Sequence, residues 1–156
     1  MRVACEAARL VAAGGIPVNG PLVEAAALLH DIDKPETRAG VGEHGVVGAA
    51  RMIERGWEEL ALPIASHPVT ALLDDDRHPK GWESVIVSVA DRHVAQEFLT
   101  TDERIDDLVA RHPQHSSSLE AARRPAAALE REVADAAGLE VDELVSRLRA
   151  AWEAGA

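Results

Sequence analysis

The sequence contains little cysteine, few aromatic residues and a shortage of basic charge. Cys5 is the one cysteine among 156 residues, so no internal disulfide can form. Aromatic residues make up 3% of the chain and tyrosine is absent, whereas a β-rich domain of this length normally contains more of them. A total of 16 Lys and Arg against 27 Asp and Glu gives a formal net charge of −11. Because this charge repels nucleic acid backbones and anionic membranes, we expect neither a nucleic acid polymer nor a membrane as a partner.

Long apolar runs are missing as well. No segment approaches the roughly 20 apolar residues of a transmembrane helix, and no charged stretch followed by an apolar one predicts a signal peptide. We therefore expect a cytoplasmic location. A chain of this length fits one hydrophobic core, which predicts a single domain over 1–156. Its core is expected at about 1–112 and a helical extension at about 115–154.

The residues that are abundant favour helices. Hydrophobic residues form 47% of the chain, mostly Ala, Leu and Val, and Ala and Leu enter helices at little energetic cost. We predict an all-α fold, a compact bundle of several helices that ends in two amphipathic ones. Apolar periodicity and breaker residues predict helical segments at about 1–13, 21–29, 43–55, 57–66, 82–99, 101–111, 117–137 and 141–154.

Three boundaries depend on weaker signals. Lys34-Pro35 is predicted to close the second helix, because proline disfavours helical geometry in the residue before it. The β-branched stretch 85–90 is compatible with a buried strand, but no breaker occurs from Trp82 to Leu99, so we predict a helix over 82–99. Pro125 is predicted to kink or restart the helix at 117–137.

Ionisable residues stand at the ends of two apolar runs. His30-Asp31 follows the run 25–29, and Asp91 follows the run 85–90. A buried carboxylate needs a cation, a metal ion or several hydrogen-bond donors to offset its lost hydration. One imidazole and two carboxylates suit a divalent ion such as Mn²⁺, Fe²⁺, Co²⁺ or Ni²⁺, and with water also Mg²⁺. The sequence therefore predicts a divalent metal cofactor bound by His30, Asp31 and Asp91.

The chain resembles the HD superfamily of metal-dependent phosphohydrolases over nearly its whole length, and in particular the small bacterial members with the HDIG-type motif. Several spaced elements in the right order are more specific than an isolated His-Asp pair. The elements that carry the resemblance are A-A-L-L-H-D-I-D-K at 26–34, E-H-G-V-V-G-A at 43–49, A-S-H at 65–67, V-A-D at 89–91, and the helix and loop from 91 to 104.

The resemblance implies a metal-dependent hydrolase that cleaves a phosphomonoester or phosphodiester bond of a small molecule, foremost a nucleotide. It assigns His30, Asp31 and Asp91 to the principal metal, whose bound water attacks phosphorus, with Asp31 orienting that water. His44 and His67 become ligands of a second metal, or groups that bind phosphate and donate a proton. Lys34 becomes a phosphate contact. The catalytic group is thus Asp31, His67 and Lys34.

The chain departs from the family pattern at two positions. The family normally has another metal-binding histidine on its first helix, but no histidine precedes His30 here. One explanation is that the start codon is assigned too late or that the chain is truncated. The other is that the protein is a catalytically degenerate binding or regulatory module. Asp33 stands where many relatives have glycine, and its carboxylate either tunes the metal or faces solvent.

Structural interpretations remain open beside these functional ones. His30-Asp31 is compatible with an ordinary helix C-terminus, and Asp91 with an ion pair to Arg92 or Arg51. His44 and His67 are compatible with capping or surface roles. A further hypothesis is a homodimer, or a purely helical interaction protein, that pairs through one apolar stripe, formed by Leu139, Val141, Leu144, Val145, Leu148 and Trp152.

Overall fold

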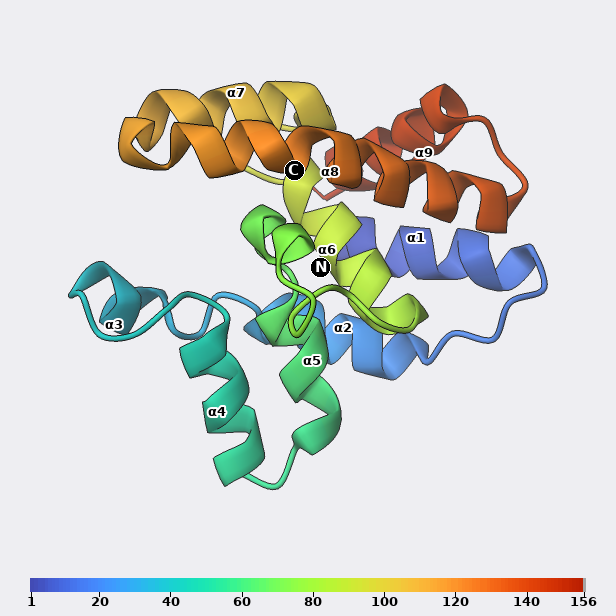
Figure 1. Cartoon of the computed structure of the whole chain (residues 1–156). Coiled ribbons are helices and arrows are strands. Elements are labelled where there is room, and N and C mark those ends of the chain that lie inside the picture. The colour runs from blue at the N-terminus through green and yellow to red at the C-terminus, as the bar shows by residue number, and fades with distance from the viewer. Residues whose placement is uncertain (156) are drawn as a thin grey trace.

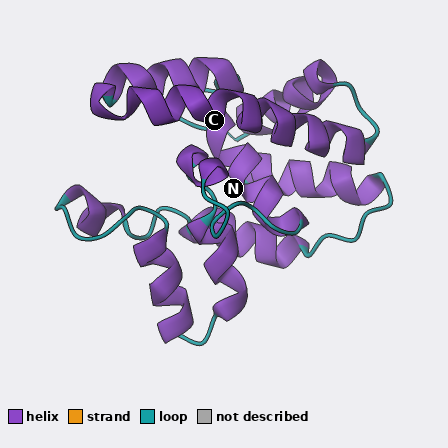
Figure 2. Ribbon diagram, viewed as in Figure 1, coloured by secondary structure: helices purple, strands orange, loops and turns teal. Residues whose placement is uncertain are grey.

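The protein is all-helical, as predicted. The computed structural model describes residues 1–155, and within them no strand longer than an isolated bridge between Val94 and Phe98 occurs (Figure 2). The elements are α1 (Arg2–Ala13), α2 (Gly20–Leu29), α3 (Lys34–Arg38), α4 (Val46–Glu54), η1 (Glu58–Leu60), α5 (Ala61–Ala65), η2 (Val69–Leu73), α6 (Trp82–His93), α7 (Thr101–Arg111), η3 (Pro113–His115), α8 (Ser116–Ala137) and α9 (Val141–Glu153).

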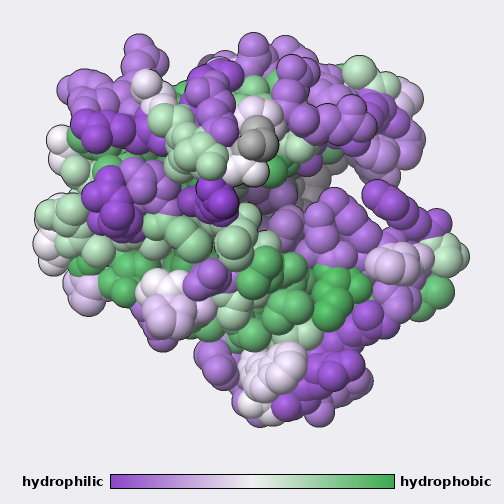
Figure 3. Space-filling model, turned by 180° about the vertical axis from the view of Figure 1, so that it is seen from behind, coloured by the Kyte–Doolittle hydropathy of each residue, from purple (hydrophilic) through white to green (hydrophobic). Residues whose placement is uncertain are grey.

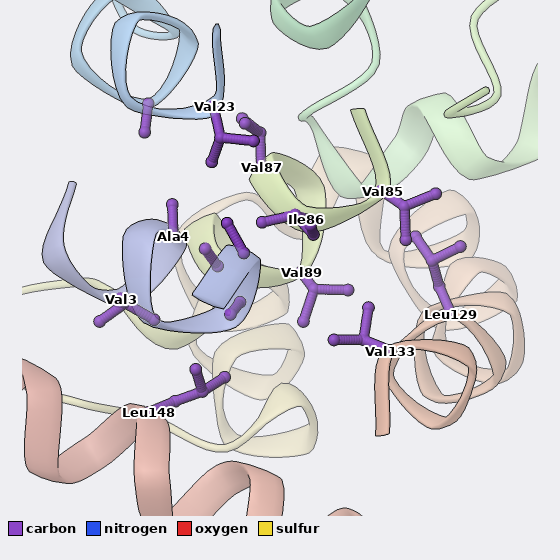
Figure 4. Close-up of a cluster of buried hydrophobic side chains, with 14 of the residues drawn as sticks. Val3, Ala4, Val23, Val85, Ile86, Val87, Val89, Leu129, Val133 and Leu148 are labelled. Atoms are coloured by element: carbon purple, nitrogen blue, oxygen red, sulfur yellow. The ribbon is translucent and has the colours of Figure 1, made fainter. Parts of the chain in front are cut away.

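Helix α6 lies at the centre of the bundle. Its residues are buried on every side, as expected of a helix that is apolar around most of its circumference. It packs against α1, α2, α5, α7 and α8. Ile86 and Val89 of α6 belong to one buried cluster with side chains of α1 and α8, and Val89 lies opposite Val133 of α8 (Figure 4). This central helix carries Asp91 near its C-terminal end.

The other helices surround α6 on three sides. Helices α7, α8 and α9 form the upper part of the molecule in Figure 1, α1 and α2 lie beside α6, and α3, α4 and α5 extend below. One buried cluster includes side chains from the first 112 residues and from α8 and α9. The face seen from behind shows an apolar area among more hydrophilic residues (Figure 3).

The apolar stripe of α9 covers the chain's own core in this structure. Leu144 and Leu148 are fully buried, and α9 packs against α1 and α8 of the same chain. The remaining members of the stripe are partly buried against the core. Pairing of two copies through this stripe stays a hypothesis.

Two predicted boundaries are wrong. Lys34-Pro35 does not close the second helix: α2 ends at Leu29, and Pro35 occupies the first turn of α3, where the missing proline N–H has no helical partner to lose. Helix α6 ends at His93 and does not reach Leu99. The chain turns back there, because the His93 carbonyl accepts from the Leu99 N–H at 3.1 Å and the His93 Nδ1–H donates to the Leu99 carbonyl at 2.8 Å.

The predicted start and end of α7 agree with the structure. Thr100 caps α7 with a reciprocal capping box to Glu103, and His112 ends that helix. The predicted restart at Pro125 is wrong, because α8 continues through this residue. In the described part of the chain, no helix combines the length and the apolar character that crossing a bilayer requires.

Candidate metal centre

The structure brings His30, Asp31 and Asp91 together. His30 caps the C-terminus of α2, Asp31 follows it in the turn before α3, and Asp91 projects from α6. His30 Nε2 lies 3.2 Å from Asp31 Oδ2 and 3.1 Å from Asp91 Oδ1. Packing of α2 against α6 thus unites two sequence segments that are distant along the chain.

His44 and His67 reach the same cluster from another side. His44 precedes α4, and His67 follows α5, which packs against α4. Asp31 Oδ1 lies 3.3 Å from His44 Nε2 and 3.8 Å from His67 Nε2, and the two Nε2 atoms are 3.0 Å apart. The imidazole of His67 also lies edge-on to those of His30 and His44. All five predicted histidine and aspartate side chains therefore form one cluster.

The three imidazoles all point the Nε2 atom toward Asp31. The Nδ1–H of His30 donates to the Ala27 carbonyl at 2.9 Å, and that of His67 donates to the Ile64 carbonyl at 2.6 Å. The Nδ1–H of His44 donates to Asp33 Oδ1 at 2.7 Å. Each ring therefore turns its Nε2 toward Asp31. Imidazoles that bind metals are commonly held in this way, with the other ring nitrogen engaged by a carbonyl or a carboxylate.

Asp33 is a functional residue whose role the sequence left open. Its side chain is 0% exposed, so the solvent-facing alternative is wrong. Besides His44, it accepts hydrogen bonds from the backbone N–H groups of Gly45 at 2.7 Å and Gly48 at 2.9 Å. These bonds fasten the N-terminus of α4 and orient His44 together. The donors lie 12 to 15 residues away along the chain, so no local spacing rule pairs them with Asp33.

Charges in the cluster compensate one another. Burial by itself would lower the pKa of His30, but hydrogen bonds to Asp31 and Asp91 raise it to about 10. Burial would raise the pKa of Asp91, yet His30 holds it at about 2. The pKa of Asp31 is also far below its usual value, because contacts with His30, His44 and Lys34 outweigh its burial. Without a metal ion, a charged His30 bridges two ionised carboxylates.

His67 behaves differently from His30. It is 1% exposed, and burial lowers its pKa to about 4. The ring is therefore neutral near pH 7 and presents a lone pair at Nε2. This favours the metal-ligand interpretation of His67 over that of a proton donor.

Lys34 lies at the edge of the cluster. Its Nζ contacts Asp31 Oδ2 at 2.5 Å from the first turn of α3. The side chain is partly exposed and lines a cleft shared with His30, Asp31 and Asp91. A cation at this position can contact both Asp31 and an anion that enters the cleft.

The donor set fits a divalent cation. One ligand atom from each of His30, Asp31 and His67 lies within 4.8 Å of the others, and Asp91 joins this group through His30. Asp31 Oδ1 is buried and receives no hydrogen bond although imidazole nitrogens surround it. A buried carboxylate oxygen without a donor is expected where a cation is meant to bind. Nitrogen and carboxylate ligands together suit first-row divalent ions.

Other candidate partners lie elsewhere. Arg51 pairs with Glu36, and the buried Arg92 donates to the Ser88 hydroxyl at 3.0 Å, so neither forms an ion pair with Asp91 within 4.0 Å. His93 points toward α8, where its Nε2 lies 2.7 Å from Glu130 Oε1. The proposed ion-pair alternative for Asp91 is therefore wrong. His78, His112 and His115 take no part in the cluster.

The cleft beside the cluster has a volume of about 480 Å³, within the range of small-molecule sites. It is lined by the first residues of α1, the end of α2, the second half of α6, the loop at 94–99 and α7.

A scan against models of protein families finds no match for this chain, and searches of curated proteins and of solved structures find none either.

Proposed function

We propose that this protein is a metal-dependent phosphohydrolase of the HD superfamily that cleaves a phosphate ester bond of a small molecule. One observation carries the proposal: three imidazoles with engaged Nδ1 atoms turn their Nε2 atoms toward Asp31. His44 and His67 face its buried, unpartnered Oδ1, and His30 faces Oδ2. The motif resemblance and the adjoining cleft support it. A nucleotide is the foremost substrate that the resemblance implies.

His30, Asp31 and Asp91 hold the principal divalent ion, which is Mn²⁺, Fe²⁺, Co²⁺, Ni²⁺ or Mg²⁺. When bound, such an ion lowers the pKa of water and polarises a phosphoryl oxygen. Asp31 has one oxygen toward His30 and Lys34 and the other toward His44 and His67. It can therefore bind the ion and orient a water molecule for attack on phosphorus.

His44, His67 and Lys34 complete the proposed site. The neutral Nε2 of His67 and, once His44 has lost its extra proton, the Nε2 of His44 can bind a second cation together with Asp31 Oδ1. In a mononuclear site the same side chains contact phosphate, and Lys34 neutralises charge on the phosphoryl oxygens. Because the pKa of His67 is lowered to about 4, this side chain is better suited to bind a metal ion or contact phosphate than to donate a proton.

The test is a phosphatase assay over a panel of nucleotides and other small phosphate esters, with each candidate metal supplied in turn. We expect hydrolysis that depends on added metal and falls at least about a hundredfold in Asp31→Asn, because that change weakens both metal binding and water orientation. Arg147→Gln, an exposed change on α9, serves as the control. Metal-independent activity, or full activity of Asp31→Asn, contradicts the proposal.

The degenerate-module hypothesis gives a different result in the same experiment. Its basis is that no histidine precedes His30 in the sequence. A protein of this kind binds the cation through His30 and Asp91 but hydrolyses no ester in the panel. That outcome favours a binding or regulatory role over catalysis.

A further inference from the structure

The cleft beside the candidate metal centre has a second charged region on α7. Arg104, Asp107 and Arg111 all line it, and their spacing places them along one side of that helix. The turn at 94–99, which replaces the predicted end of α6, supplies the neighbouring wall with Gln96 and Leu99. The cleft therefore extends from the imidazole and carboxylate cluster to a group of guanidinium side chains.

Arg104 is held in the cleft by few bonds. Its side chain is only 13% exposed, yet the one polar contact recorded for it is Nη1 to Asp107 Oδ2 at 3.3 Å. A guanidinium group has five N–H donors in a planar fork. Most of its donors are therefore free for a ligand, and its charge also lowers the pKa of Asp91.

Asp107 faces two guanidinium groups. Both of its oxygens accept from Arg111, through Nη2 and through Nε at 3.0 Å, while Arg104 has only the longer contact. One carboxylate cannot pair fully with two arginines, and Glu97, which also lines the cleft, is not an ion-pair partner of either. The guanidinium fork of Arg104 therefore stays open to a ligand, although the whole chain is strongly acidic.

Aliphatic side chains occupy other parts of the cleft wall. Val3 and Ala4 come from α1, Val87 comes from α6, and Val94 and Leu99 come from the turn. These side chains favour an organic group of a ligand over free ions. The cleft thus offers a cation-binding cluster, an aliphatic wall and a guanidinium pair.

We propose that Arg104 and Arg111 form an anion-binding subsite, and that the substrate is a small phosphate ester with a second anionic group. This inference rests on the proposed function, because the cleaved phosphate is assigned to the metal centre. The planar fork of arginine matches both phosphate and carboxylate. The subsite selects doubly anionic esters over singly anionic ones of the same length.

The test measures binding of uncleavable probes to the Mn²⁺-loaded protein by titration calorimetry. Propane-1,3-bisphosphonate and 4-phosphonobutyrate carry a second phosphonate or a carboxylate, and propylphosphonate carries neither. We expect the doubly anionic probes to bind about tenfold more tightly, the effect of one added bond to a charged group. The ratio between the two doubly anionic probes shows which second group the subsite prefers.

Variants of α7 separate this subsite from general effects on folding. Arg104→Gln and the more exposed Arg111→Gln should reduce the tenfold preference, which is the ratio of affinities for the doubly anionic probes and propylphosphonate, to threefold or less. Asp107→Asn should increase the preference, because both arginines lose a competing carboxylate. Arg147→Gln on α9 should change nothing. If Arg104, Asp107 and Arg111 only stabilise the structure, Asp107→Asn should weaken binding of the doubly anionic probes, as the two arginine variants do.

The outcomes also separate this inference from the proposed function. If wild-type protein binds Mn²⁺ through His30 and Asp91 but binds all three probes equally, the subsite is refuted and the metal centre stands. If His30→Ala binds Mn²⁺ as tightly as wild type, the metal centre itself is refuted. Loss of the preference in Arg104→Gln together with its increase in Asp107→Asn supports the subsite.

Discussion

At the residue scale, Asp33 links backbone structure to the orientation of His44. Three donors converge on its buried carboxylate. In Asp33→Asn the new amide N–H₂ group must face one of these donors, which leaves a buried donor without an acceptor. Such a loss costs about 1–3 kcal/mol. We expect urea unfolding to show a decrease of this size in the free energy of unfolding.

Asp75→Asn is the matched control for this change. Asp75 is exposed in the loop between η2 and α6, and exposed substitutions of this kind stay within about 0.5 kcal/mol of wild type. If Asp33→Asn is as stable as Asp75→Asn, the three hydrogen bonds do not have the role assigned to them.

The raised pKa of His30 makes the stability of the metal-free protein depend on pH. A histidine with a raised pKa in the folded state stabilises the fold fully below its ordinary pKa of 6.5. That contribution is lost as the pH rises toward about 10, the pKa in the folded protein. After chelator treatment, we expect the free energy of unfolding to fall across this interval.

The comparison is with His30→Gln over the same pH range. This variant lacks the titrating group, so its free energy of unfolding should decrease less between pH 6.5 and about 10. Parallel curves for the two proteins would mean that His30 does not carry the charge between Asp31 and Asp91.

At the element scale, Gly48 allows α4 to approach α5 and the turn that holds Asp33. A Cβ at this position would lie 2.9 Å from Ile64 Cγ2 and 3.3 Å from Asp33 Oδ2. Overpacking of this kind costs about 1–3 kcal/mol, and alanine regains about 1 kcal/mol in helix propensity. We therefore expect Gly48→Ala to reduce the free energy of unfolding by up to about 2 kcal/mol, which thermal unfolding measures.

Gly20→Ala provides the opposite case. Gly20 begins α2, and no atom lies within 4 Å of a Cβ built there. We expect an unchanged or slightly raised melting temperature. A stabilising Gly48→Ala would show that the close approach of α4 is not tight enough to require glycine.

Most helices follow from periodicity and breakers, whereas the errors arise where tertiary contacts set a boundary. The N-terminal cap of α7 can be predicted from the sequence because Thr100 and Glu103 lie three residues apart. The end of α6 cannot be predicted in this way, because no glycine or proline occurs there and the turn depends on hydrogen bonds between His93 and Leu99. Pro35 is compatible with either end of a helix, and the sequence does not choose between them.

At the scale of the whole molecule, α9 belongs to the core. Leu148 is 0% exposed and packs in the cluster that includes Val3 of α1. Leu148→Ala should lower the free energy of unfolding by about 2–5 kcal/mol through lost burial and a cavity. Thermal or urea unfolding measures this effect.

Leu28→Ala is the control for the same chemical change at the surface, because Leu28 is 62% exposed. We expect it to change the free energy of unfolding by less than about 0.5 kcal/mol. Equal losses in the two variants would contradict the packing of α9 into the core.

The sequence predicts which histidine and aspartate residues belong to the candidate site, but not the contacts that join them to other segments. His30, Asp31 and Asp91 stand out because ionisable residues end apolar runs. The hydrogen bonds to Asp33 and the position of the α7 arginines in the cleft beside His30, Asp31 and Asp91 depend on packing of distant segments, which sequence spacing does not encode. The amphipathic pattern of α9 also fits either an interface or a core, and only packing distinguishes them.

The central claim is that His30, Asp31 and Asp91 bind one divalent cation. Titration calorimetry of Mn²⁺ into the chelator-stripped protein tests it most directly, with His30→Ala, Asp91→Ala and the exposed His112→Ala in parallel. We predict that wild type and His112→Ala bind Mn²⁺ equally well. His30→Ala and Asp91→Ala should lose more affinity than the roughly 10- to 100-fold that is typical when a residue contacting a metal ligand is changed. Absence of Mn²⁺ binding by wild type, or equal affinity in all four proteins, would contradict the claim.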